Sequence, residues 1–202
     1  MFVDDCRYPF QDQEYERFGC EVTNRSPGIG AWGNWALGLL ELRIRFPVAK
    51  RYAIFQDDLV CVRGLRDYLD RFRPEHGYLN LYTVQQNADQ RPEGFEHGWY
   101  LSNQMGRGAL ALVLPHDAVD ALLSDPAFAR KAQDCGHPAS KIDGTVAGCL
   151  KRAGWLEYVH YPSLVEHTGV KRSEIGHDVG AYRMAPSFPG EETDASVWAI
   201  LG

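Results

Sequence analysis

The sequence predicts an α/β fold in which short buried strands alternate with amphipathic helices. Runs rich in aliphatic, β-branched and aromatic residues occur at 52–55, 78–83, 109–114 and 155–161, and segments with helical spacing of apolar residues separate them. Several of these runs begin or end at glycine or at charged residues, which is typical of strands that emerge from a core at a polar edge. We expect one domain over residues 1–202, since this length buries a sizeable core and no compositional change suggests a linker.

The first part of the chain predicts a short strand and a long helix. Residues 1–3 are apolar and form the strand, and a polar, irregular stretch follows. After the turn-rich loop 26–30, Asn34 can cap a helix, because its side chain can accept a hydrogen bond from a free backbone N–H. Apolar residues then recur at helical spacing up to Phe46, and Pro47 ends the helix.

The middle of the chain predicts two strands that lead into polar segments. The run 52–55 stops abruptly at Gln56-Asp57-Asp58, and a short helix is expected at 65–72. The strand 78–83 is followed by a polar segment with proline and glycine, 85–97, which is predicted to be a loop.

The second half predicts a strand, three helices and a final strand. Gly106-Arg107-Gly108 precedes the strand 109–114. Helices are expected at 117–123, from Pro126 onward, and from an Asp143 cap to about residue 152. The strand 155–161 follows, and residues 166–202, which are rich in glycine, serine, histidine and charge, are predicted to be a loop-rich tail.

Composition narrows the class of protein. The formal net charge of −6 gives no support to a strongly basic nucleic-acid-binding surface. The five cysteines are odd in number and lack C-x-x-C spacing, which favours reduced thiols over a disulfide framework or a zinc knuckle. The N-terminus lacks the features of a signal peptide, and the longest apolar stretch, 109–115, is too short to cross a bilayer. We therefore expect a cytoplasmic protein with no membrane partner.

The adjacent carboxylates Asp57 and Asp58 are the first candidate site. Two carboxylates at a strand end repel each other unless a cation lies beside them. Hard oxygen ligands suit Mg²⁺ or Mn²⁺, and the ends of strands in open α/β sheets are where ligands bind. The alternative interpretation is a solvated turn that happens to contain two acids.

Three further motifs also suggest a functional site, but each of them alone is weak evidence. The glycines of Gly106-Arg107-Gly108 let backbone approach a ligand closely, or simply form a turn. Asp143 is either a helix cap or a general base. In the segment 166–173, His167 is a potential metal ligand, and Lys171 and Ser173 are suited to phosphate oxygens.

In their order and spacing these motifs resemble those of glycosyltransferases of the A-type fold (GT-A). Such enzymes carry an Asp-rich (DXD) metal motif after a central strand, then a glycine-rich strand start, an acidic residue that opens a helix, and a late histidine. The chain shows Gln56-Asp57-Asp58, Gly106-Arg107-Gly108, Asp143 and His167 in that order, and the resemblance covers about residues 26–177. It implies a Rossmann-type mixed sheet flanked by helices. The strand at residues 1–3 looks like the second of such a fold, so the nucleotide-binding part is expected to be shortened.

The resemblance also implies roles for individual residues. Asp58 and His167 would hold Mn²⁺ or Mg²⁺, and Asp143 would deprotonate the acceptor hydroxyl, with inversion at the anomeric carbon. The nucleotide-sugar donor would be bound by Asn34, Gln56, Asp57, Gly106, Arg107, Gly108, Lys171 and Ser173. The motif begins with Gln56 where the family pattern has aspartate, so Asp58 would carry most of the metal binding.

Two other classes of function fit the same residues. A phosphoryl-transfer or hydrolytic metalloenzyme would use Asp57, Asp58 and His167 around a metal, although a hydrolase is expected to need further acidic ligands. A non-catalytic sugar- or nucleotide-binding module would bind donor without turnover. For a transferase the expected acceptor is a glycan hydroxyl. A hydroxylated base in DNA is the alternative acceptor, and the net charge of −6 does not support it.

Overall fold

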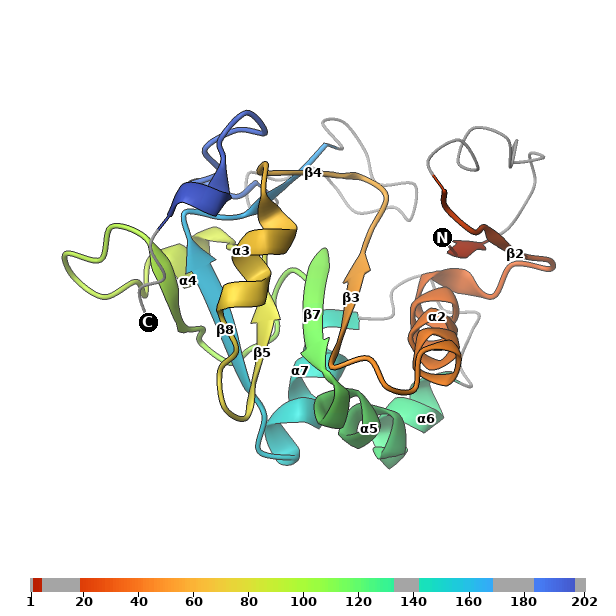
Figure 1. Cartoon of the computed structure of the whole chain (residues 1–202). Coiled ribbons are helices and arrows are strands. Elements are labelled where there is room, and N and C mark those ends of the chain that lie inside the picture. Colours follow the sequence, from red (N-terminus) through yellow and green to blue (C-terminus); the bar gives the residue numbers. More distant parts are fainter. Residues whose placement is uncertain (1, 5–18, 133–141, 169–183, 199–202) are drawn as a thin grey trace.

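The computed structural model describes residues 2–4, 19–132, 142–168 and 184–198. Its centre is a mixed sheet of five strands with helices on both faces (Figure 1). The predicted α/β class and the flanked mixed sheet are therefore confirmed. No helix in the described ranges is long and apolar enough to span a membrane.

The central sheet has the strand order β3-β7-β5-β8-β6. β5 and β8 are parallel, and the other neighbouring strands are antiparallel. The bounds of the strands, in sheet order, are β3 Arg51–Phe55, β7 Ala111–Pro115, β5 Gly77–Asn80, β8 Leu156–Tyr161 and β6 Gly98–Leu101.

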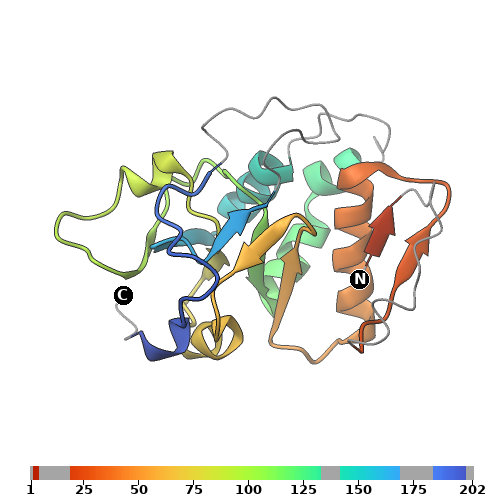
Figure 2. The same ribbon diagram turned by 90° about the horizontal axis from the view of Figure 1, so that it is seen from above.

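The two faces of this sheet carry separate hydrophobic cores. Because side chains alternate along a strand, Tyr78 and Leu112 enter one core while Leu79 and Val113 enter the other. Figures 1 and 2 show α5 and α7 behind the sheet and α3 in front of it. The helices that contribute to the first core are α2 Gly30–Arg45, α5 His116–Ser124, α6 Pro126–Ala132 and α7 Ile142–Arg152. The helix α3, Leu65–Arg71, contributes to the second core. A further short helix, α4, spans Gln85–Ala88.

The N-terminal strand does not join the central sheet. β1 (Phe2–Asp4) pairs in parallel with β2 (Thr23–Arg25), and this pair lies beside α2 (Figure 2). The predicted strand is therefore present, but it belongs to a small separate sheet.

A second small sheet joins the segment after β3 to the segment after β8. β4 (Leu59–Cys61) pairs with β9 (Val165–His167) in an antiparallel arrangement. A 3-10 helix, η2 (Ala195–Val197), follows later in the tail. Glu166 and His167, the first two residues of the predicted loop-rich tail, lie on β9. Strands β2, β4, β6 and β9 have only three or four residues, which is too short for periodicity to reveal them.

Two predicted helix caps are wrong. α2 begins at Gly30, so Asn34 lies inside the helix, and the N-cap Ile29 makes no side-chain cap. The Asn34 side chain instead joins α2 to the N-terminal strands: Oδ1 accepts from Arg25 Nε at 2.8 Å, and Nδ2 donates to the Phe2 carbonyl at 3.0 Å. Similarly, α7 begins at Ile142, which places Asp143 in the first turn rather than at the cap.

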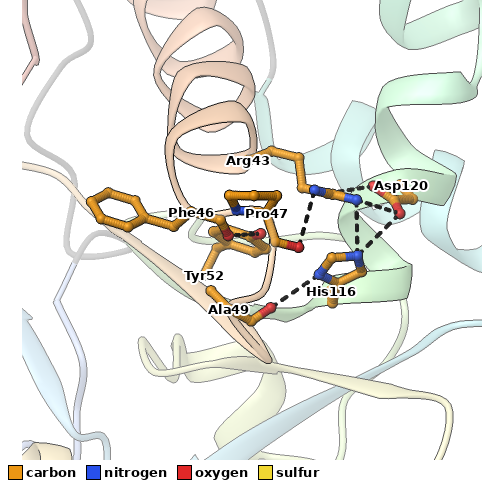
Figure 3. Close-up of polar contacts among 7 residues, drawn as sticks. All are labelled: Arg43, Phe46, Pro47, Ala49, Tyr52, His116 and Asp120. Carbon is orange, nitrogen blue, oxygen red and sulfur yellow. Dashed lines mark hydrogen bonds and ion pairs between the residues drawn. The ribbon is translucent and has the colours of Figure 1, made fainter.

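A polar cluster fixes the connection from α2 to β3 (Figure 3). Arg43 binds both carboxylate oxygens of Asp120 on α5, at 2.7 and 3.1 Å, and lies 2.9 Å from His116 Nε2. The hydrogen bond from Arg43 holds the pKa of the Asp120 carboxyl below its ordinary value. His116 Nδ1 lies 3.0 Å from the Ala49 carbonyl, to which it donates when Nε2 accepts from Arg43. Tyr52 Oη donates to the Phe46 carbonyl at 2.7 Å.

Candidate metal and donor site

The Gln56-Asp57-Asp58 motif lies directly after β3, between the central sheet and the small β4–β9 sheet. Gln56 continues the pairing with the segment before β7. Its backbone N–H donates to the Leu110 carbonyl at 2.9 Å, and its Nε2 lies 3.4 Å from the Ala109 carbonyl. The predicted position of the motif at the end of a strand is therefore confirmed.

Asp58 and His167 lie in direct contact. Leu59 pairs with His167 across the β4–β9 ladder, and the Thr168 N–H donates to the Asp58 carbonyl at 2.8 Å. This register brings Asp58 Oδ2 to 3.0 Å from His167 Nε2. The sequence proposed these two residues as the metal ligands, and the structure brings them together.

The Asp58–His167 pair has the spacing of two neighbouring metal ligands. Ligands on adjacent corners of an octahedron, each about 2.1 Å from Mg²⁺, lie about 3.0 Å apart. The same distance suits a direct ion pair, so the spacing fits both states. In addition, the Oδ1 atom of Asp58 is buried and has no hydrogen-bond partner among the described residues, while the side chain as a whole is 42% exposed. A buried carboxylate oxygen without a partner is costly, and a cation bound to this carboxylate would remove that cost.

The protein supplies few metal ligands at this place. Within the described ranges no group of three or more His, Cys, Asp or Glu side chains is arranged to hold a metal. The neighbouring Glu166 carboxylate accepts from the backbone N–H of His167 at 2.7 Å and from that of Ala185 at 3.0 Å, so it secures the tail. A cation on Asp58 and His167 would take its remaining ligands from water or substrate phosphates, as Mg²⁺ commonly does.

Asp57 is exposed and makes no hydrogen bond or ion pair with the rest of the described chain. Its carboxylate is therefore accessible to a ligand that reaches the end of β3. Lys171 and Ser173, which are the predicted donor-binding residues of the tail, lie outside the described residues. Both hydrogen-bonding ends of the Asn34 amide are used in joining α2 to Arg25 and Phe2, so the structure gives Asn34 a supporting role in the fold.

Gly106-Arg107-Gly108 and Asp143 form a second cluster. Gly106 and Gly108 have φ values of 61° and 78°, which glycine adopts readily. The Gly108 N–H donates to Asp143 Oδ2 at 2.8 Å, and the Arg107 carbonyl accepts from Asn80 Nδ2 at 2.8 Å. Asp143 therefore holds the glycine segment against the start of α7 instead of capping its own helix.

Glu157 lies beneath this cluster and is not among the residues predicted from the sequence. It is 2% exposed, and its Oε1 accepts from Asn80 Nδ2 at 3.2 Å and from Tyr78 Oη at 3.3 Å. Its Oε2 is buried without a partner in the described structure. Burial, to which the nearby Asp143 charge adds, raises the pKa of the Glu157 carboxyl above its ordinary value. The sequence held one signal for this residue, namely a glutamate within the largely apolar strand 155–161. Glu is almost never fully buried without a partner, so a glutamate on a buried strand indicates a polar cluster.

The segment 106–110 connects the two clusters. Its end pairs with Gln56 next to the Asp57-Asp58 motif, and Gly108 binds Asp143. In the described part of the chain, no hydrogen bond or ion pair links Asp143 with Asp58. Among the described residues, Asp143 is connected with the motif through the segment 106–110 and not by a direct contact.

No protein-family model matches the chain, and a comparison with curated proteins found no significant match.

Proposed function

We propose that the chain is a metal-dependent inverting glycosyltransferase that transfers a sugar from a nucleotide-sugar donor to an acceptor hydroxyl. The observation that carries the proposal is the contact between Asp58 and His167 at the end of β3. The order of the GT-A-like motifs predicts that these two residues are metal ligands. They come from opposite halves of the chain, and the fold brings them into contact.

The proposed roles of the residues come from the GT-A-like resemblance, and the positions of the residues are compatible with them. Asp58 and His167 would hold Mn²⁺ or Mg²⁺, which when bound would neutralise charge developing on the diphosphate. Asp57 is exposed at the motif and available to the donor, while Gln56 fixes the motif to the segment 109–110.

Asp143 is the proposed base. The Gly108 N–H orients its carboxylate through Oδ2, which leaves Oδ1 to accept a proton. In the transfer, the acceptor oxygen forms a bond to the anomeric carbon as the bond from that carbon to the diphosphate oxygen breaks. The acceptor proton passes to Asp143, and the attack from the opposite face inverts the anomeric configuration.

The proposal is tested by incubating the protein with a panel of nucleotide sugars and glycan acceptors, with Mn²⁺ or with chelator, and analysing the products by mass spectrometry. We expect glycosylated product with metal and none with chelator, and an NMR spectrum of the product that shows an inverted anomeric configuration. Donor binding without any turnover would favour a non-catalytic module. Full activity in chelator, or release of phosphate without sugar transfer, would refute the proposal.

A metal-dependent hydrolase receives less support from the same geometry. Such an enzyme would need further acidic ligands, and in the described chain Glu166 is engaged with backbone N–H groups rather than placed as a third ligand.

A further inference from the structure

We propose that the protein has a second binding site, for a small organic anion with an apolar body. The site is a cavity at the end of the sheet where β3 begins and β7 ends. Gln56-Asp57-Asp58 lies at the other end of β3. This proposal does not depend on glycosyl transfer.

The cavity combines a cationic rim with an apolar floor. Its volume is about 140 Å³, and Lys50, Arg51 and Arg73 line it together with Leu79 and Val113. A cavity of about 150 Å³ accommodates benzene in another protein, so this one is large enough for a ring or a short branched chain. Small-ligand sites typically pair apolar walls with a few polar groups that orient the ligand.

The charge at the rim is positive. Arg51 is already engaged, because it donates to the Leu69 and Phe72 carbonyls at 2.8 and 3.2 Å and to Asp70 at 2.7 Å. Asp70 also forms an ion pair with Arg73, at 3.9 Å. Lys50 makes no ion pair with any other described residue.

These contacts leave an excess of positive charge at the cavity. No Asp or Glu is among the described residues that line the cavity, and Asp70 forms ion pairs with Arg51 and Arg73 but not with Lys50. The whole chain has a formal net charge of −6, so this local excess runs against the overall balance. It favours an anionic ligand, and Lys50 and Arg73 are the cations that remain to bind it.

The backbone that carries Lys50 is held in place before any ligand binds. His116 donates its backbone N–H to the Lys50 carbonyl at 2.9 Å, and its ring lies 3.0 Å from the Ala49 carbonyl. Figure 3 shows how Arg43 and Asp120 anchor that ring to α2 and α5. A site built on fixed backbone loses less conformational entropy when a ligand binds.

The cavity is separate from the candidate metal site. The five residues of β3 lie between Lys50 and Gln56, and a strand of that length spans about 16 Å. An anion bound at Lys50 therefore cannot contact a metal on Asp58. The floor residues Leu79 and Val113 are paired neighbours on β5 and β7, which places the cavity on the face of the sheet that carries α3.

The probe for this site is benzoate, which joins a carboxylate to a ring of suitable size. Benzyl alcohol is the neutral comparison, and inorganic phosphate is an anion without an apolar body. Binding is measured by isothermal titration calorimetry and by amide chemical-shift changes in NMR. We expect benzoate to bind more tightly than either comparison and to shift the amides of Gly77, Leu79 and Val113.

The variants for this test replace exposed cationic side chains. Lys50→Met and Arg73→Met should each weaken benzoate binding about tenfold, because each removes a charge-assisted contact. Lys151→Met, at an exposed lysine on α7, removes the same charge elsewhere and should leave the affinity unchanged. Benzoate binding that is absent, that is equally weakened by Lys151→Met, or that is no tighter than phosphate binding would overturn the proposal. A melting temperature for each variant verifies that it folds.

Discussion

The imidazole Nε2 of His167 lies 3.0 Å from the carboxylate Oδ2 of Asp58, and this contact joins the residue just before β4 to the last residue of β9. The ladder between β4 and β9 sets the contact, since Leu59 is the direct partner of His167. Asp58 is therefore held against a potential metal ligand, while its neighbour Asp57 is exposed.

This difference predicts unequal effects of substitution on metal binding. Asp58→Asn should weaken Mn²⁺ binding by at least about tenfold, because changes even in groups that support metal ligands cost this much. Asp57→Asn is the matched control, and its effect on Mn²⁺ affinity should be smaller. Electron paramagnetic resonance of free Mn²⁺ measures both affinities. Equal affinities for Asp58→Asn and the wild type would show that Asp58 is not a ligand.

The features that could be predicted from the sequence are those that depend on local pattern. The apolar run 52–55 and the acids after it identified β3 and its polar end, and helical spacing identified α3, α5 and α7. The strands β4 and β9 could not be predicted, because each has three residues and exists only through its partner.

Side-chain partners from distant segments explain the errors. Asn34 and Asp143 both have side chains suited to capping, yet each binds a group from another part of the chain, Arg25 and Gly108 respectively. Capping rules weigh only the nearest backbone N–H groups. The burial of Glu157 likewise depends on the pairing of β8 with β5, which no local pattern shows.

The next prediction concerns Asp143 as the proposed base. Asp143→Asn retains an oxygen that can accept from the Gly108 N–H, so the glycine segment should stay in place. The substitution removes the basicity, and the transfer rate should fall by about 10²–10⁴-fold. Donor affinity and the melting temperature should remain near their wild-type values, which separates catalysis from folding. Sugar transfer at the wild-type rate would leave Asp143 with the structural role alone.

Two glycines near α7 should respond to alanine in opposite ways. At Gly106 a Cβ would collide with the Ala147 side chain and lie 2.5 Å from the Asp143 carbonyl, at a φ of 61° that alanine rarely adopts. We expect Gly106→Ala to destabilise the protein by at least about 1–3 kcal/mol. Gly144 lies inside the helix with open space around its Cβ position, so Gly144→Ala should raise the free energy of unfolding by about 0.5–1 kcal/mol.

Urea unfolding of both glycine variants measures these changes. The comparison is informative because the same methyl group is added to a glycine that packs against α7 and to a glycine that belongs to α7. A Gly106→Ala variant as stable as Gly144→Ala would mean that the glycine segment does not pack against α7 as closely as the structure shows.

The last prediction concerns the buried imidazole of His160. The ring is fully buried, Nε2 lies 2.6 Å from Tyr68 Oη, and Nδ1 lies 2.6 Å from the Pro162 carbonyl. The carbonyl requires a donor, so Nδ1 carries the proton and Nε2 accepts from the tyrosine. Burial lowers the pKa of His160 to about 3. In the unfolded chain a histidine has a pKa of about 6.5.

Stability should therefore fall in acid. As the pH drops below about 6.5, the imidazole of the unfolded chain becomes protonated. The imidazole of the folded protein stays neutral until the pH approaches about 3. The contribution of His160 to the free energy of unfolding should fall by roughly 2 kcal/mol from pH 7 to pH 5. Urea unfolding at both pH values measures the change, and His160→Gln should lose this part of the pH dependence whatever its absolute stability.

A second histidine provides the control for this test. His76 is exposed and has a φ of 50°, which asparagine tolerates, so His76→Asn is a control variant that removes an exposed imidazole with little strain. NMR of the folded wild-type protein gives an independent measurement, since the His160 ring signals should not titrate between pH 7 and pH 5. A titration of His160 near pH 6.5 in the folded protein would show that the imidazole is neither as buried nor as firmly bonded to Tyr68 and Pro162 as the structure indicates.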